Sequence, residues 1–194
     1  AGISADEFAA LAAKLPEAAD GDIVAAHPTL APSSALAPLL RRGSKSGFVV
    51  VDMTDVDELA PIPEVDVPDT PLYLLRSVDR GDDLRGVRPN DAVPELLGRG
   101  RSPLTLNEGI SWLLVRPDRL EPNHCFMTAG SRLVRRPGKA GGKLDARVPA
   151  IWISGGTGRD TSANRNAPKV GWCWAGNTHT WLGFASCAAR TAAA

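Results

Sequence analysis

The residues best suited to ligand recognition gather near the C-terminus. Gly176-Asn177 is a two-residue turn signal between two apolar runs, so the segment predicts a β-hairpin. In that register Trp172 lies opposite Trp181 and Trp174 lies opposite His179, and all four side chains share one face. Such a face predicts a stacking platform for a base, a sugar or another planar ligand. The alternative is a sheet face buried beneath a helix.

A glycine-rich loop, Gly155–Pro168, precedes these tryptophans and carries cations. Arg159 and Arg165 lie in it, and Lys169 follows directly. Glycine lets backbone N–H groups approach a phosphate, and guanidinium groups match its oxygens. These side chains, with the tryptophans, predict a pocket for a small anionic ligand in the C-terminal third. The alternatives are a nucleic-acid-binding surface, to which the basic segment Arg132–Arg147 would contribute, a solvated loop, and a scaffold protein with no small-molecule site.

Two residues are candidates for catalysis. His179 is a candidate acid or base, because the unperturbed pKa of histidine lies near neutrality. Cys125 is a candidate nucleophile with His124 or His179 as its base, and a buried inert cysteine is the alternative. The sequence contains no G-x-S-x-G, H-E-x-x-H, Walker A or G-x-G-x-x-G motif. Whether the protein is an enzyme therefore stays open.

Metal ligands are present in unfavourable patterns. Two histidines and two cysteines form a familiar zinc set, but His124-Cys125 is not the spacing of a zinc knuckle. The predicted hairpin also places Cys173 and His179 on opposite faces. The segment Asp79–Asp83 holds three carboxylates that can bind Mg²⁺ or Ca²⁺, and a solvated turn is the alternative. The sequence predicts no metal site and identifies no cofactor.

The composition is that of a soluble globular protein. The chain has 194 residues, 43% hydrophobic and 23% charged, which suits one domain with a full core. No apolar run approaches the roughly 20 residues that span a bilayer, and the N-terminus has no signal-peptide pattern. Three widely spaced cysteines suit a reducing compartment. We therefore expect a cytoplasmic protein with no membrane partner.

The charge is distributed unevenly although the net charge is zero. Residues 1–98 hold 8 Lys/Arg and 17 Asp/Glu, a net charge of −9, and residues 99–194 hold 14 and 5, a net charge of +9. The asymmetry suggests an anionic partner for the C-terminal half. The alternative is that the two halves face each other and neutralise.

The elements that must position these residues follow from caps and apolar runs. Capping boxes at Ser4–Glu7 and Thr105–Glu108 predict helices that end before Pro16 and Pro117. A short helix is predicted at 35–42, and strands at 47–53, 71–78, 125–128, 148–154, 170–174 and 179–185. Helices early and strands late predict one α+β domain over residues 1–194, with a mostly antiparallel sheet and a C-terminal Trp-rich hairpin.

Several distinctive strings lie between about Pro68 and Cys187. They include VDRGDDLRGV (Val78–Val87), GRSPLTLNEGI (Gly100–Ile110), NHCF, PAIWIS and APKVGWCWAGNTHTWLG. With them the chain resembles an actinobacterial family known as a domain of unknown function. Residues 68–187 form the family-like core, and residues 1–65 match it loosely. The resemblance implies an actinobacterial source and supplies no catalytic residues.

Overall fold

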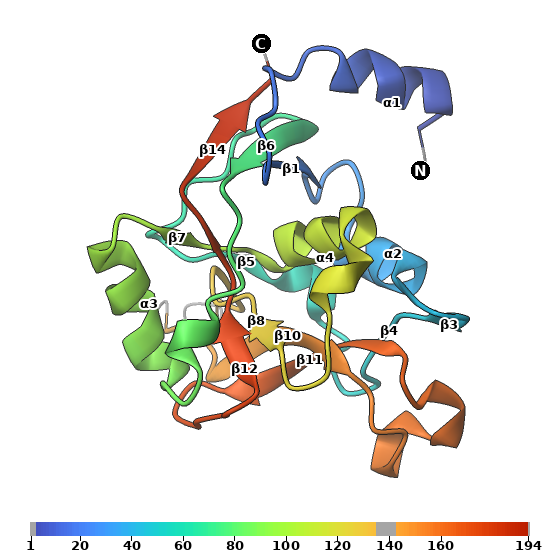
Figure 1. The fold of residues 1–194 in the computed structure, drawn as a ribbon, viewed down its shortest axis with the longest axis vertical. Coiled ribbons are helices and arrows are strands. Elements are labelled where there is room, and N and C mark those ends of the chain that lie inside the picture. Colours follow the sequence, from blue (N-terminus) through green and yellow to red (C-terminus); the bar gives the residue numbers. More distant parts are fainter. Residues whose placement is uncertain (1–2, 135–142, 194) are drawn as a thin grey trace.

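A computed structural model describes residues 3–134 and 143–193 of the chain. Helix α4 (Leu106–Val115) lies at its centre, between a three-stranded and a five-stranded sheet (Figure 1). Eight of the ten residues of this helix are buried, as expected of a helix that lies between two layers. The arrangement confirms the predicted single α+β domain.

The three-stranded sheet joins the two ends of the chain. Its strands are antiparallel in the order β1 (Ile23–Ala26), β6 (Leu72–Arg76) and β14 (Ala189–Ala192). The central strand β6 confirms the strand predicted at 71–78, and its residues Leu72–Leu75 are buried because both faces are covered. As a result, the loop after β6 lies beside the start of β1, where Val78 N donates to Gly21 O at 3.4 Å.

The five-stranded sheet carries the tryptophans. Its order is β12 (Leu182–Phe184), β8 (Cys125–Met127), β10 (Arg147–Ile153), β11 (Pro168–Trp174) and β4 (Phe48–Val49). Strands β8, β10 and β11 are antiparallel, whereas β12 and β4 pair in parallel at the two edges. A Cβ atom on Gly109 of α4 would lie 2.4 Å from the side chain of Thr128, which follows β8, so any side chain there would collide with this layer.

The predicted C-terminal hairpin does not form. Strand β11 pairs with β10, so Trp174 lies opposite Arg147 and not opposite His179. The segment after the turn becomes β12, which pairs in parallel with β8, and Leu182 lies opposite Cys125. The Gly176-Asn177 turn is therefore a connection between separated strands. The turn signal was outweighed by the longer and more apolar β10, which offers β11 seven paired residues.

The helices confirm both capping boxes. In α1 (Ala5–Ala12) Ser4 and Glu7 bond reciprocally, and Thr105 and Glu108 do the same at the start of α4. None of the residues of α1 is buried, and Phe8 is among the exposed large hydrophobic residues of the protein. Helix α3 (Pro89–Gly98) was not predicted; Pro89 stands in its first turn, where the missing N–H has no intrahelical partner to lose.

Short elements complete the chain. The predicted helix at 35–42 is instead α2 (Ser33–Leu36) followed by the 3-10 helix η1 (Ala37–Leu39), and only two residues of the predicted strand at 47–53 are in β4. The other short strands are β2 (Arg41–Arg42), β3 (Lys45–Ser46), β5 (Ala60–Pro61), β7 (Ser102–Pro103), β9 (Ser131–Arg132) and β13 (Ser186–Cys187). The other 3-10 helices are η2 (Val56–Glu58), η3 (Asp82–Leu84), η4 (Pro117–Arg119), η5 (Gly158–Asp160) and η6 (Ser162–Asn164).

A buried ion pair fixes α4 to the three-stranded sheet. Glu108, which is 0% exposed, accepts hydrogen bonds from Arg190 of β14 at 2.6 and 2.8 Å. Tyr73 of β6 donates to the same carboxylate at 2.9 Å, and Thr105 N donates to it at 2.7 Å. Burial and the Glu108 charge raise the pKa of Tyr73, so the phenol stays a donor. The C-terminal strand thus holds the helix that positions the site below.

Among the described residues, none of the helices has the length and apolar character needed to cross a membrane.

Candidate functional site

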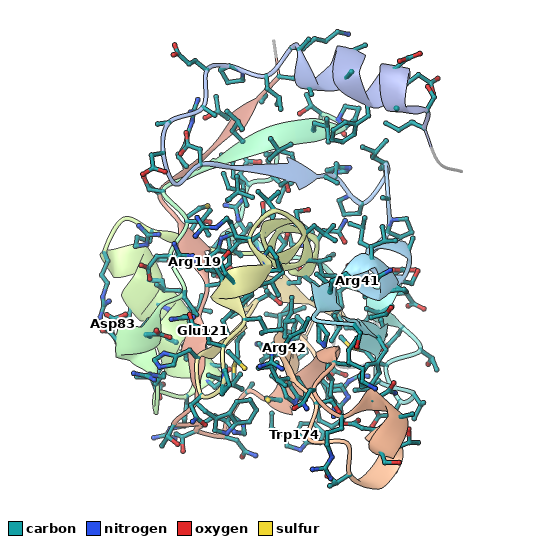
Figure 2. The ribbon with its side chains drawn as sticks, turned by 45° about the vertical axis from the view of Figure 1, so that its right-hand side comes forward. Arg41, Arg42, Asp83, Arg119, Glu121 and Trp174 are labelled. Carbon is teal, nitrogen blue, oxygen red and sulfur yellow. The ribbon has the colours of Figure 1, made fainter. Side chains whose placement is uncertain are left out.

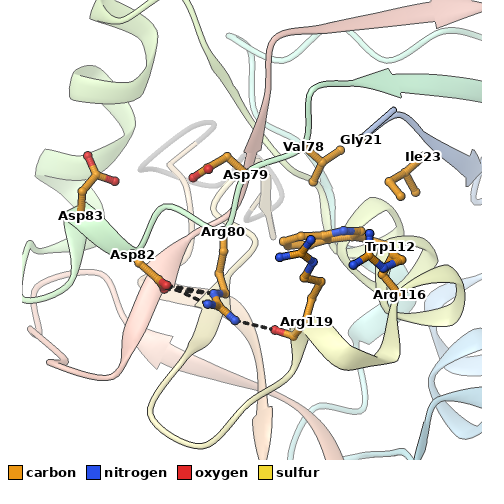
Figure 3. Close-up of a pocket in the computed structure, with 10 residues that line it drawn as sticks. All are labelled: Gly21, Ile23, Val78, Asp79, Arg80, Asp82, Asp83, Trp112, Arg116 and Arg119. Carbon is orange, nitrogen blue, oxygen red and sulfur yellow. Dashed lines mark hydrogen bonds and ion pairs between the residues drawn. The ribbon is translucent and has the colours of Figure 1, made fainter. Parts of the chain in front are cut away.

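A cavity of about 460 Å³ opens beside the C-terminal end of α4. Four separate stretches of the chain build it: the start of β1, the loop after β6, the last turns of α4, and η4. We call it the arginine cavity. It is lined by Gly21, Ile23, Val78, Asp79, Arg80, Asp82, Asp83, Trp112, Arg116 and Arg119 (Figure 3).

The loop of residues 79–83 is shaped by a glycine. Gly81 has a left-handed backbone with φ of +70°, and a Cβ atom there would lie 2.2 Å from the carbonyl oxygen of Phe184. Gly81 N donates to Asp79 Oδ1 at 2.6 Å, which closes the turn, and the backbone of Asp79 pairs with Ser186 at 2.9 Å in both directions. The VDRGDD string therefore encodes a tight turn held against β12 and β13.

Arg80 fastens this loop to the segment after α4. Its guanidinium donates to the Asp82 carboxylate at 2.9 to 3.1 Å and to Glu121 at 3.1 Å, and it reaches the carbonyl of Arg119 at 3.0 Å. His124 Nδ1 lies 3.0 Å from the same Asp82 carboxylate. Partial burial acts to raise the pKa of Asp82, but the hydrogen bonds from Arg80 and His124 outweigh it and hold the pKa below its usual range. Asp82 is therefore ionised and fully engaged.

The other two arginines keep open donors. Arg116 uses Nε and one terminal nitrogen on Asp118, at 2.9 and 2.8 Å, and its second terminal nitrogen has no partner within the described residues. Arg119 has only a distant pairing, Nε to Asp118 at 3.6 Å, and both its terminal nitrogens lack a described partner. Figure 3 shows the Arg119 side chain beside the Trp112 ring. Trp112 is 4% exposed and supplies an apolar wall.

The carboxylates of the cavity are largely occupied by partners of their own. Asp82 is held by Arg80, Asp83 pairs with Arg99 of the neighbouring turn, and one oxygen of Asp79 accepts from Gly81 N. Among the described residues, the cavity groups without a protein partner are therefore mainly guanidinium donors of partly exposed side chains. Such donors bind carboxylates and phosphates in a bidentate manner, and the Trp112 wall suits an apolar or planar body next to the anionic group.

The tryptophans of the predicted platform fall into two groups. Trp172 and Trp174 alternate with Lys169 along β11 and contact each other edge to face, with centroids 4.7 Å apart. Trp181 instead contacts the rings of Trp152 and His179, with centroid distances of 6.1 Å and 5.5 Å. Trp152 lies opposite Lys169 and therefore occupies the other face of the sheet from Trp172. The expected single face of three tryptophans and a histidine is wrong, because it depended on the hairpin register.

The cations that were predicted to bind an anion lie in different surroundings. Lys169 donates to Asp160 at 2.8 Å and lies 4.8 Å from the centroid of Trp152, so it is a structural contact on its own sheet face. Arg159 pairs with Asp52 at 3.0 Å on the surface, and Arg165 is exposed. Of the basic segment, Arg135, Arg136 and Lys139 lie outside the described residues.

The charge asymmetry is partly neutralised inside the fold. Arginines of the positive half pair with acids of the negative half in three places: Arg99 with Asp83, Arg147 with Asp55, and Arg159 with Asp52. These contacts agree with the alternative in which the two halves face each other.

The two predicted catalytic residues lie apart from the lining of the arginine cavity. Burial lowers the pKa of His179, and its Nε2 is buried without a partner in the part of the chain that the structure describes. Burial raises the pKa of Cys125 to about 11, so the thiol is protonated at neutral pH. Within residues 3–134 and 143–193, no three His, Cys, Asp or Glu side chains are grouped to hold a metal ion.

Sequence reasoning missed the residues that supply the open donors of the cavity. Arg116 and Arg119 follow a predicted helix, and nothing in their spacing marks them as a pair. Trp112 stands one helical turn before Arg116, which is the one available signal, because residues four apart share a helix face. The acidic cluster at 79–83 was recognised, but its role as the wall of a cavity depends on the distant segment 112–119.

Comparison with known proteins places the chain in a family. Neither the curated proteins nor the solved structures contain a significant match to it. A family model described as a family of unknown function (DUF5701) matches residues 1–193. The match includes residues 1–65, which were expected to resemble the family only loosely. The chain belongs to this family.

Proposed function

We propose that the protein binds a small organic anion in the arginine cavity. The observation that carries the proposal is the pair Arg116 and Arg119 beside the Trp112 wall: one terminal nitrogen of Arg116 and both of Arg119 have no partner among the described residues. Guanidinium groups without a full set of acceptors gain most from a carboxylate or phosphate, because charge-assisted hydrogen bonds are the strong ones. A volume of about 460 Å³ is in the usual range for a small-molecule site.

The acids of the cavity do not oppose an anion as strongly as their number suggests. Asp82 and Asp83 already face cations, Arg80 and Arg99, so the field that reaches the ligand is that of compensated pairs. The free oxygen of Asp79 remains an acceptor, which suits a hydroxyl or amine on the same ligand. The ligand that fits best is therefore a small anion with an apolar or planar part and at least one donor.

We propose binding and assign no reaction to the cavity. The candidates His179 and Cys125 are absent from the lining that the structure describes. The proposed site thus moves from the C-terminal third, where Arg159, Arg165 and Lys169 were expected to supply charge, to the end of α4. The alternative is a nucleic-acid-binding surface formed by the exposed Trp174 (Figure 2) and the basic loops. The following test distinguishes this surface from a small-anion site.

The test is a titration of the whole protein with inorganic phosphate, citrate, AMP and a single-stranded oligonucleotide, followed by NMR of the tryptophan indole signals at low and high salt. A small-anion site predicts saturable binding of citrate or AMP with a shift of the Trp112 indole signal. A nucleic-acid surface predicts that only the oligonucleotide binds, with a steep loss of affinity as salt rises and a shift of Trp174. Absence of binding to all four would overturn the proposal.

The cellular setting remains a proposal as well. Three free, buried cysteines, in the described part without a disulfide, support a reducing compartment such as the cytoplasm. An actinobacterial source is proposed on the strings VDRGDDLRGV and APKVGWCWAGNTHTWLG. Fractionation of the native host cell, with detection of the protein by antibody, would test the location.

A further inference from the structure

A second cavity, of about 220 Å³, lies at the opposite end of α4. The segment after β1, the strand β5 and the first turn of α4 form its walls. We infer that this apolar cavity is a binding site for a small neutral molecule with an apolar body and one hydrogen-bond acceptor. Its lining includes His27, Leu59, Val67, Leu106, Asn107 and Ser131.

Most polar groups in the wall have bonds within the protein. Ser33 Oγ donates to Asn107 Oδ1, and the Asn107 amide donates to the carbonyls of Ala26 at 3.3 Å and Ala31 at 2.8 Å. Ser131 Oγ accepts from Leu106 N at 3.0 Å, which caps the start of α4. No Lys, Arg, Asp or Glu is among the described residues lining the cavity. A charged ligand would lose its hydration there without gaining a partner.

Donors are left over on two hydroxyls and on the imidazole of the wall. Ser131 Oγ and Thr105 Oγ1 each accept a backbone N–H, and no described residue accepts from either hydroxyl. His27 Nδ1 accepts from Thr29 N at 3.2 Å and lies 2.7 Å from Thr29 Oγ1, so in the tautomer with the proton on Nε2 the ring has an N–H without a partner among the described residues. All three residues line the cavity, which therefore offers hydrogen-bond donors beside its apolar walls. A ketone, ester or ether oxygen is the complementary group.

The size of the cavity supports an occupant. An apolar cavity of roughly 150 Å³ stays free of water and accepts a benzene-sized molecule. The present cavity is larger, and Leu59, Val67 and Leu106 give it apolar walls. Water would find few partners on these apolar side chains.

The experiment is a calorimetric and NMR titration with three probes of similar shape: acetophenone, ethylbenzene and benzoate. We expect acetophenone to bind most tightly, ethylbenzene about tenfold more weakly because it lacks the acceptor, and benzoate to leave the signals of Leu59 and Val67 unchanged. Acetophenone binding should persist in Arg119→Gln, which separates this site from the arginine cavity. Absence of acetophenone binding to the wild type would overturn the inference.

Two variants locate the site. Val67→Phe fills the cavity and should abolish binding of acetophenone and ethylbenzene alike; unchanged binding would contradict the assignment. His27→Asn keeps an acceptor for Thr29 N but removes Nε2, so acetophenone should lose part of its advantage over ethylbenzene. If Val67→Phe does not fold, Leu59→Ala enlarges the cavity and should allow the bulkier 1-acetonaphthone to bind. Failure of both the larger ketone and acetophenone to bind Leu59→Ala would also overturn the inference.

Discussion

The two ends of α4 border cavities of opposite character. At the N-terminal end no Lys, Arg, Asp or Glu is among the described lining residues, and the cavity near Leu106 is mostly apolar. At the C-terminal end the cavity near Trp112 is lined by three arginines and three aspartates, and two of the guanidinium groups keep nitrogens without a described partner. Strand β1 runs along the same helix, with Ile23 in one cavity and His27 just after the strand in the other. The comparison shows that the donors left without partners determine which ligand a cavity can hold.

The largest loss of stability is expected from a substitution at Glu108, because this residue supports α4, which borders both cavities. Glu108 is buried in the first turn of α4 and neutralises Arg190, so Glu108→Gln leaves a buried guanidinium without its counter-charge. We expect the free energy of unfolding to fall by about 3–5 kcal/mol, as measured by urea denaturation. The control is Glu95→Gln, an exposed partner of Arg99, which should cost less than about 1 kcal/mol. Equal losses for the two variants would contradict the role given to Glu108.

A smaller effect distinguishes the arginine cavity from the apolar one. Gly81→Ala combines a positive φ with a collision against Phe184, and we expect a loss of roughly 2 kcal/mol or more together with loss of anion binding. Gly86→Ala is the matched control, because φ there is +84° but nothing lies within 4 Å of the added Cβ. It should cost only about 1 kcal/mol and spare binding. Binding of acetophenone should survive both substitutions, as followed by calorimetry.

The smallest effect is the pH dependence at the arginine cavity. Because the pKa of Asp82 is lowered in the folded protein, its contribution to stability is present above the unfolded pKa and is lost as pH falls through the folded pKa. The stability difference between wild type and Asp82→Asn should therefore be greatest near neutral pH and shrink below about pH 4. Chemical denaturation between pH 2 and pH 7 measures it. A difference that stays constant over this range would contradict the account.

How far the sequence predicts this protein depends on the range of each signal. The capping boxes at Ser4 and Thr105 are local, and both helices form as expected. The buried runs in β6, β8 and β10 are equally local and are also confirmed. The hairpin failed because the partner of β11 is chosen by competition among strands, which a turn signal alone does not decide.

The candidate site was beyond prediction for the same reason. The VDRGDD string indicates a turn, but the cavity exists only because segments near residues 21, 80 and 116 meet in space. The prediction that Trp172, Trp181 and His179 share one face was wrong because it assumed the wrong strand pairing. Ligand sites made of distant segments require the tertiary arrangement.

The most direct test of the central claim compares two double variants in a calorimetric titration with citrate and AMP. Arg116→Gln/Arg119→Gln removes the open donors of the arginine cavity, and Arg159→Gln/Arg165→Gln removes the cations of the C-terminal loop. We predict that the first variant weakens binding by at least about tenfold for each arginine, while the second binds like the wild type. Loss of binding only in the second variant would contradict the account and return the site to the Trp-rich C-terminal segment.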